Sequence, residues 1–103
     1  MKHMKHPDME QVDLMDIMYA LSDPTRLEIV RCLAKKRRPM NCGELVLNRP
    51  KSSMSHHFKI LRAAGLVRTV VEGTEHMNSL RRAEVEEKFP NVLGSILKVL
   101  TRD

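Results

Sequence analysis

Residues 51–66 carry the side chains best suited to chemistry, and these favour recognition of a polyanion. Apolar residues recur at spacings of four, three and three, which places them on one face of a helix: Met54, Phe58, Leu61 and Ala64. The other face has hydroxyl, imidazole and cationic groups and no carboxylate: Ser52, Ser55, His56, Lys59 and Arg62. Such groups bind phosphates and base edges. The segment therefore predicts a DNA recognition helix, which Gly65 ends.

The alternative is a solvated cationic face that binds nothing, and the charge distribution argues against it. Residues 24–68 hold 11 Lys and Arg against two acids, a net charge of +9. The rest of the chain carries −4 of the total +5. A basic block between acidic ends is the electrostatic pattern of a protein that binds a polyanion through one region.

Catalysis is not expected. Ser55, His57 and Cys42 are nominal nucleophiles and bases, but no Ser/His/Asp spacing, Gly-rich phosphate loop or metal constellation accompanies them. The sequence therefore predicts a non-enzymatic protein that needs no cofactor.

Helices before residue 51 must position the recognition helix within one domain spanning residues 1–103. We expect helices over about 12–21 and 24–36, the second capped by Asp23 with Pro24 in its first turn. The basic run 35–38 closes that helix and fits either capping or phosphate contact. A short helix from residue 41 or 42 through Leu47 and a turn at 48–50 complete a helix-turn-helix unit.

Residues 66–80 change to a strand pattern. A β-branched run at 66–71 and a returning run at 76–80 flank a turn at 72–75, which predicts a hairpin, or wing, directly after the recognition helix. A final amphipathic helix is expected over about 91–101, after a possible turn at 83–88. The predicted fold is mainly α with a small β-hairpin, a winged helix-turn-helix of order α-α-α-α-β-β-α, with residues 1–9 flexible.

The first and last helices each carry an apolar stripe, although the central helices already fill a small core. We expect these stripes, within residues 10–21 and 89–101, to pair across a twofold homodimer. The alternative is that they pack on their own domain. The predicted interface residues are Leu14, Ile17, Met18, Phe89, Leu93, Ile96, Leu97 and Leu100.

The chain has no apolar run long enough to cross a membrane and no signal-peptide core at its N-terminus. Its two cysteines are too few for a secreted disulfide scaffold. We therefore expect a soluble, cytoplasmic protein without a membrane partner.

Two segments resemble the ArsR-type (ArsR/SmtB) winged-helix repressors. Residues 19–30 read YALSDPTRLEIV, similar to the opening of the family's domain, and residues 52–67 read SSMSHHFKILRAAGLV, similar to its recognition helix and following strand. The resemblance extends from about Leu14 to Leu100. It implies a homodimeric, cytoplasmic prokaryotic regulator that binds an inverted-repeat operator, leaves it when an effector arrives, and dimerises through its first and last helices.

The resemblance also places the DNA contacts. Base and phosphate contacts fall on the start of the recognition helix, phosphate contacts on its later cations, and minor-groove contacts on the wing. His57 matches the family's frequent histidine, for which we expect a structural role. Glu72 and Glu75 flank the wing tip and would repel phosphate, so the wing binds weakly or not at all. The predicted DNA-binding residues are Lys51, Ser52, Ser53, Ser55, His56, Lys59, Arg62, Arg68, Gly73 and Thr74.

The sequence departs from the family's metal sites. It lacks a Cys-x-Cys before the recognition helix and any His in the last helix, so no zinc site is expected. One remaining option is a thiol pair, Cys32 and Cys42, that responds to an oxidant, reactive sulfur or a thiophilic ion. Cys42, near a helix N-terminus, is then the more reactive, and Cys32 would otherwise be a core residue.

Two other options remain for control. His3, Met4, His6 and Met9 could bind a soft metal, against the simpler view of a flexible tail. The chain could also have no small-molecule site and be controlled by abundance or a protein partner. An alternative for the whole protein is a winged-helix interaction module that reads DNA weakly or not at all, which the acidic wing slightly favours.

Overall fold

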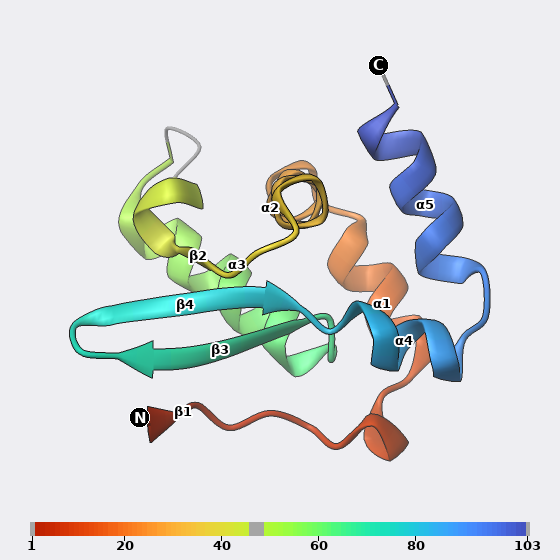
Figure 1. The fold of residues 1–103 in the computed structure, drawn as a ribbon, viewed down its shortest axis with the longest axis horizontal. Helices are drawn as coiled ribbons and strands as arrows, with labels where there is room; N and C mark the ends of the chain where they lie inside the picture. The colour runs from red at the N-terminus through yellow and green to blue at the C-terminus, as the bar shows by residue number, and fades with distance from the viewer. Residues whose placement is uncertain (1, 46–48, 103) are drawn as a thin grey trace.

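The computed structural model describes residues 2–45 and 49–102. A hairpin projects from one side of a group of helices, and the N-terminal segment runs along the outer strand of that hairpin (Figure 1). The first helices are α1 (Leu14–Leu21) and α2 (Pro24–Lys36). The bounds of α2 match the prediction, and Asp23 caps it by accepting hydrogen bonds from the backbone of Thr25 and Arg26. Helix α1 begins slightly later than predicted, because Asp13 caps it.

The structure contains the predicted helix-turn-helix in the residues that it describes, 24–45 and 49–63. The short helix is a 3₁₀ turn, η2 (Cys42–Leu45), and the predicted Val46, Leu47 and Asn48 lie outside the described residues. The recognition helix is α3 (Lys51–Ala63). Gly65 follows it with a φ of 86°, the left-handed conformation expected for a glycine that ends a helix.

The wing is confirmed as strands β3 (Val67–Glu72) and β4 (Glu75–Leu80), joined by a two-residue turn at Gly73 and Thr74. Two short strands widen it to a four-stranded antiparallel sheet of order β1-β3-β4-β2. They are β1 (Lys2–His3) beside β3 and β2 (Met40–Asn41) beside β4. Neither is predicted from the sequence, because two residues are too few for a recognisable period.

The N-terminal segment, expected to be flexible over 1–9, packs on the wing instead. Strand β1 pairs with Val70 and Val71, and a 3₁₀ turn, η1 (Met9–Gln11), follows. Pairing in this position covers backbone groups that β3 would otherwise leave open at the sheet edge.

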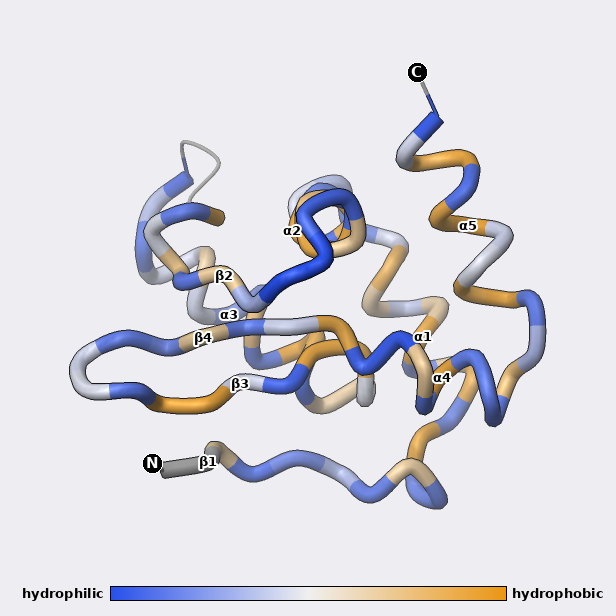
Figure 2. The backbone as a smooth tube through the Cα atoms, in the orientation of Figure 1, coloured by the Kyte–Doolittle hydropathy of each residue, from blue (hydrophilic) through white to orange (hydrophobic). Residues whose placement is uncertain are grey.

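The chain ends with α4 (Arg82–Lys88), where a turn was expected, and α5 (Val92–Thr101). Helix α5 packs against α2 and α4, and hydrophobic and hydrophilic residues alternate along it (Figure 2). Within the described residues, every helix is too short or too polar to span a lipid bilayer.

The core corrects part of the predicted dimer interface. Ile17, Leu93 and Leu97 are 1%, 0% and 2% exposed, so they belong to the core of the single chain. They lie on the inner face of α1 and α5, packed with residues of α2 and α3. Of the other predicted interface residues, Met18 is exposed and four are half-buried: Leu14, Phe89, Ile96 and Leu100.

Candidate nucleic-acid interface

Helix α3 presents the two faces that its sequence predicts. Its apolar side is buried in the core through Met54, Phe58 and Leu61. Its outer side is exposed and carries no acidic residue. The predicted DNA-binding residues on this exposed side are Lys51, Ser52, Ser55, His56 and Lys59. A row of hydroxyl, imidazole and ammonium groups of this kind can donate to phosphates and base edges.

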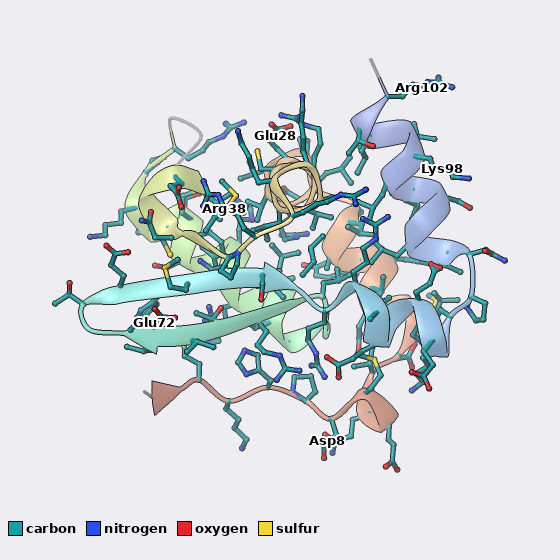
Figure 3. The ribbon with its side chains drawn as sticks, viewed as in Figure 1. Asp8, Glu28, Arg38, Glu72, Lys98 and Arg102 are labelled. Carbon is teal, nitrogen blue, oxygen red and sulfur yellow. The ribbon has the colours of Figure 1, made fainter. Side chains whose placement is uncertain are left out.

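The wing tip lies against the first half of α3. Between them is a groove of about 720 Å³ lined on one side by Lys51 and Ser55 and on the other by Thr74 and Glu75. The structure therefore brings the predicted Thr74 beside the predicted helix residues. Glu75 accepts a hydrogen bond from the side chain of Asn41 (3.2 Å), and Glu72 lies at the same end of the sheet (Figure 3). The tip thus carries the two carboxylates that disfavour phosphate there.

A buried arginine holds α3 in place from behind. Arg26, which is 5% exposed, donates from Nε to Ala20 O (2.7 Å) and from Nη2 to Tyr19 O (3.2 Å), both at the end of α1. Its Nη1 lies 3.2 Å from Nδ1 of His57 in α3. Burial lowers the pKa of His57, although Asp23 nearby acts in the opposite direction, so a neutral imidazole accepts from the guanidinium. His57 thus has the structural position expected for it.

Three predicted DNA contacts are not on the exposed side of α3: Ser53, Arg62 and Arg68. Arg68 forms an ion pair with Glu84 at the start of α4 (2.8 Å), which Arg81 also contacts. These two arginines hold the pKa of Glu84 at about 2, so the predicted minor-groove role of Arg68 conflicts with this pairing. Arg62 is half-buried on the flank of α3, beside the N-terminal segment. Ser53 is also half-buried.

Comparison with known proteins agrees with this architecture. A family model for a helix-turn-helix domain matches residues 21–70. The HTH-type transcriptional regulator YceK of Bacillus subtilis (strain 168) is 38% identical over 86 residues, which are 82% of this chain and 82% of YceK. An HTH-type transcriptional regulator of Methanocaldococcus jannaschii is 40% identical over 60 residues, 57% of this chain and 67% of that protein. The solved structure of an ArsR-like transcriptional regulator from Rhodococcus sp. RHA1 is 30% identical, with a TM-score of 0.61 over 86% of this chain and 76% of that one.

This chain is an ArsR-type helix-turn-helix transcriptional regulator. The resemblance seen in residues 19–30 and 52–67 is confirmed, as is the winged helix. The regulator binds DNA, and its role is not enzymatic.

The two thiols of the regulator are free and have different surroundings. Cys32 in α2 donates to Glu28 (3.5 Å), whereas Cys42 accepts from the side chain of Asn78 (3.6 Å). Burial, followed by the charge of Glu28, raises the pKa of the Cys32 thiol, which disfavours a reactive thiolate. Cys42 lines the groove between α3 and the wing tip.

The basic run at 35–38 is partly used within the regulator. Arg37 ends α2 in the left-handed conformation, with a φ of 54°. Arg38 forms an ion pair with Glu44 in η2 (2.9 Å). These contacts favour the capping interpretation for the end of the run.

His, Cys, Asp and Glu side chains form no cluster of three or more that could hold a metal ion in the part of the chain that the structure describes, residues 2–45 and 49–102. His6 accepts a hydrogen bond from the backbone N–H of Thr69 (2.9 Å), so one nitrogen of its imidazole already has a protein partner.

Proposed function

We propose that this regulator is a homodimeric repressor that places α3 in the major groove of an inverted-repeat operator. The exposed, acid-free face of α3 carries the proposal. Ser52, Ser55 and His56 would contact base edges and phosphates, while Lys51 and Lys59 neutralise phosphates. Gly73 and Thr74 would meet the flanking backbone only weakly, because Glu72 and Glu75 adjoin them.

Binding to duplex DNA tests this division of roles. We expect Lys59→Ala to weaken binding to every sequence and to reduce the slope of log affinity against log salt by about 0.9, the value for one lost phosphate contact. Ser55→Ala and His56→Ala should instead reduce the preference for the duplex upstream of the protein's own gene over a random duplex. Equal losses on both duplexes for all three variants would contradict the assignment. Salt-independent, weak binding of the wild type would favour the protein-interaction module.

The proposed dimer surface combines the outer faces of α1 and α5. Among the described residues, four large apolar side chains are more than half exposed in the single chain: Met15 (69%), Met18 (55%), Tyr19 (62%) and Val99 (65%). Half-buried apolar residues continue the same two helices: Leu14, Ile96 and Leu100. Exposed apolar area of this extent is stabilised when a second copy covers it.

A charge within this surface should produce monomers. We expect Val99→Glu to sediment as a monomer and to bind DNA weakly, because each half of an inverted repeat needs one protomer. The matched control is Lys98→Glu, an exposed neighbour in the same helix. A fully dimeric Val99→Glu variant would disprove this interface.

We infer that release from DNA, if it depends on a thiol, uses Cys42. Its position in the groove beside Lys51 and Ser55 supports this choice, since a group added there would stand next to the DNA-facing helix. Anisotropy titrations of reduced and mildly oxidised protein should then differ for the wild type and coincide for Cys42→Ser. If reduced and oxidised wild-type protein gave identical titrations, the thiol hypothesis would be excluded. The remaining hypotheses would then be control by abundance, by a metal or by a protein partner.

A further inference from the structure

A second groove runs along the other half of α3. It has a volume of about 510 Å³ and lies between the end of α3 and the N-terminal segment. Three cations contribute to its walls and no acidic residue does, among the described residues that line it. Its lining residues are Met4, Lys5, His6, Pro7, Gln11, Lys59, Arg62 and Ala63.

Arg62 is the half-buried cation of this groove. Burial lowers the pKa of its guanidinium, which means that the surroundings of Arg62 disfavour its positive charge. Arg68 and Arg81 share Glu84. In contrast, the guanidinium of Arg62 has no hydrogen bond or ion pair within residues 2–45 and 49–102. A partly desolvated cation of this kind gains most from an anion that comes from outside the chain.

Lys5 is held on the opposite wall by contacts on both sides of it. His3 pairs with Val70 in the sheet, and His6 accepts from the backbone of Thr69 (2.9 Å). Arg81 Nη1 then donates to Pro7 O (2.8 Å). These anchors fix the backbone around Lys5, so bringing its ammonium to the groove costs little further chain entropy.

We propose that Lys5, Lys59 and Arg62 form a site for a backbone phosphate of DNA, which makes the N-terminal segment part of the DNA interface. The inference rests on the proposed function, because Lys59 also belongs to the exposed face of α3. Lys5 and Lys59 are both exposed, so the site is open to a long polyanion as well as to a small one. It also places cations at the base of the wing, whereas the tip carries Glu72 and Glu75.

Salt titrations on a random-sequence duplex test the site, because phosphate contacts do not depend on sequence. We expect Lys5→Gln to lower the slope of log affinity against log salt by about 0.9, so that affinity falls about threefold less between about 50 and 200 mM salt. Arg62→Gln should do the same, and Lys5→Arg should keep the wild-type slope. The matched control is Lys98→Gln, on α5 away from the wing (Figure 3), which should change nothing.

The outcomes separate this inference from the proposed function. If wild type binds the duplex and Lys59→Gln lowers the slope while Lys5→Gln does not, the N-terminal site is wrong and the proposed function stands. If wild type shows no salt-dependent binding, both are wrong. A small organic anion is the other possible occupant. Anilinonaphthalene sulfonate serves as the probe for such an anion. The phosphate assignment would be overturned if Arg62→Gln abolished binding of this probe while Lys5→Gln left the slope of log DNA affinity against log salt unchanged.

Discussion

Nη1 of Arg26 lies 3.2 Å from Nδ1 of His57, and this contact joins the first turn of α2 to helix α3. The same guanidinium donates to the carbonyls of Tyr19 and Ala20 at the end of α1 and lies over the Tyr19 ring. One side chain therefore ties the proposed dimer helix to the proposed DNA helix.

Arg26→Met should lower the free energy of unfolding by about 2–3 kcal/mol, because it removes charged hydrogen bonds from a buried network. Urea denaturation at neutral pH would measure the loss. Lys35→Met, an exposed change in the same helix, should stay within about 0.5 kcal/mol of the wild type. In a double-mutant cycle with His57→Phe, the two losses should not add. Strict additivity would mean that the Arg26–His57 contact stabilises nothing.

The stability of the protein should fall as the pH drops below the ordinary histidine pKa of 6.5. Burial lowers the pKa of His57 in the folded state, so the neutral form is stabilised by folding. That contribution is complete above pH 6.5 and is lost as the pH falls through the folded value. His57→Gln keeps an acceptor for Arg26 but cannot titrate, so it should lose less stability than the wild type between pH 7 and 5. His76→Gln, at an exposed site, should follow the wild type, and an unchanged pH dependence in His57→Gln would refute the prediction.

Gly65 and Gly73 offer a matched pair, since both have a positive φ, of 86° and 63°. A Cβ at Gly65 would lie 2.4 Å from Val12 Cγ2, whereas a Cβ at Gly73 would meet nothing within 4 Å. Gly73→Ala should therefore cost only the left-handed strain, about 1 kcal/mol. Gly65→Ala adds the clash and should cost about 3 kcal/mol or more. Denaturation curves would show the ranking, and Val12→Ala should recover part of the Gly65→Ala loss; equal costs for the two glycines would disprove the packing argument.

Glu84 should stabilise the protein at neutral pH through its two arginines. Its folded pKa of about 2 lies below the ordinary 4.5, so the contribution is present above pH 4.5 and disappears as the pH falls toward 2. The carboxylate is 44% exposed, and solvent screening reduces the contribution to about 1 kcal/mol. Glu84→Gln should thus unfold more easily at pH 7 and match the wild type near pH 2. Glu87→Gln, an exposed change in the same helix, serves as the control; a difference that persists at pH 2 would exclude the ion pairs as its cause.

Cys32 should react slowly with alkylating agents. Burial and Glu28 raise the pKa of its thiol, so little thiolate is present at neutral pH. In a Cys42→Ser background, iodoacetamide should label the folded protein more slowly than the same protein in urea, and Glu28→Gln should speed the labelling. Fast labelling of folded Cys42→Ser protein would restore Cys32 as a candidate sensor.

The sequence by itself determined the features of this regulator that depend on residues close together in the chain. Asp23 and Pro24 start α2, and a period of three and four residues defines α3. Gly65 stops α3, and the turn at 72–75 joins the two strands of the wing. Each signal depends on contacts within one or two turns of chain, where spacing alone fixes geometry. The family resemblance rests on the same local motifs.

Only the tertiary structure decided which side chains are used in contacts within the chain and which stay available for DNA or a second copy. Arg68 and Glu84 are 16 residues apart, and Thr69 and His6 are 63 apart. Such pairings depend on how helices and strands pack against one another, so they cannot be predicted from the spacing of residues along the chain. The same packing turned Ile17, Leu93 and Leu97 into the core, leaving Met15, Met18 and Val99 outside. An amphipathic stripe shows that a helix buries one face; only the neighbours in space determine which residues of the stripe meet the core and which are left for a partner.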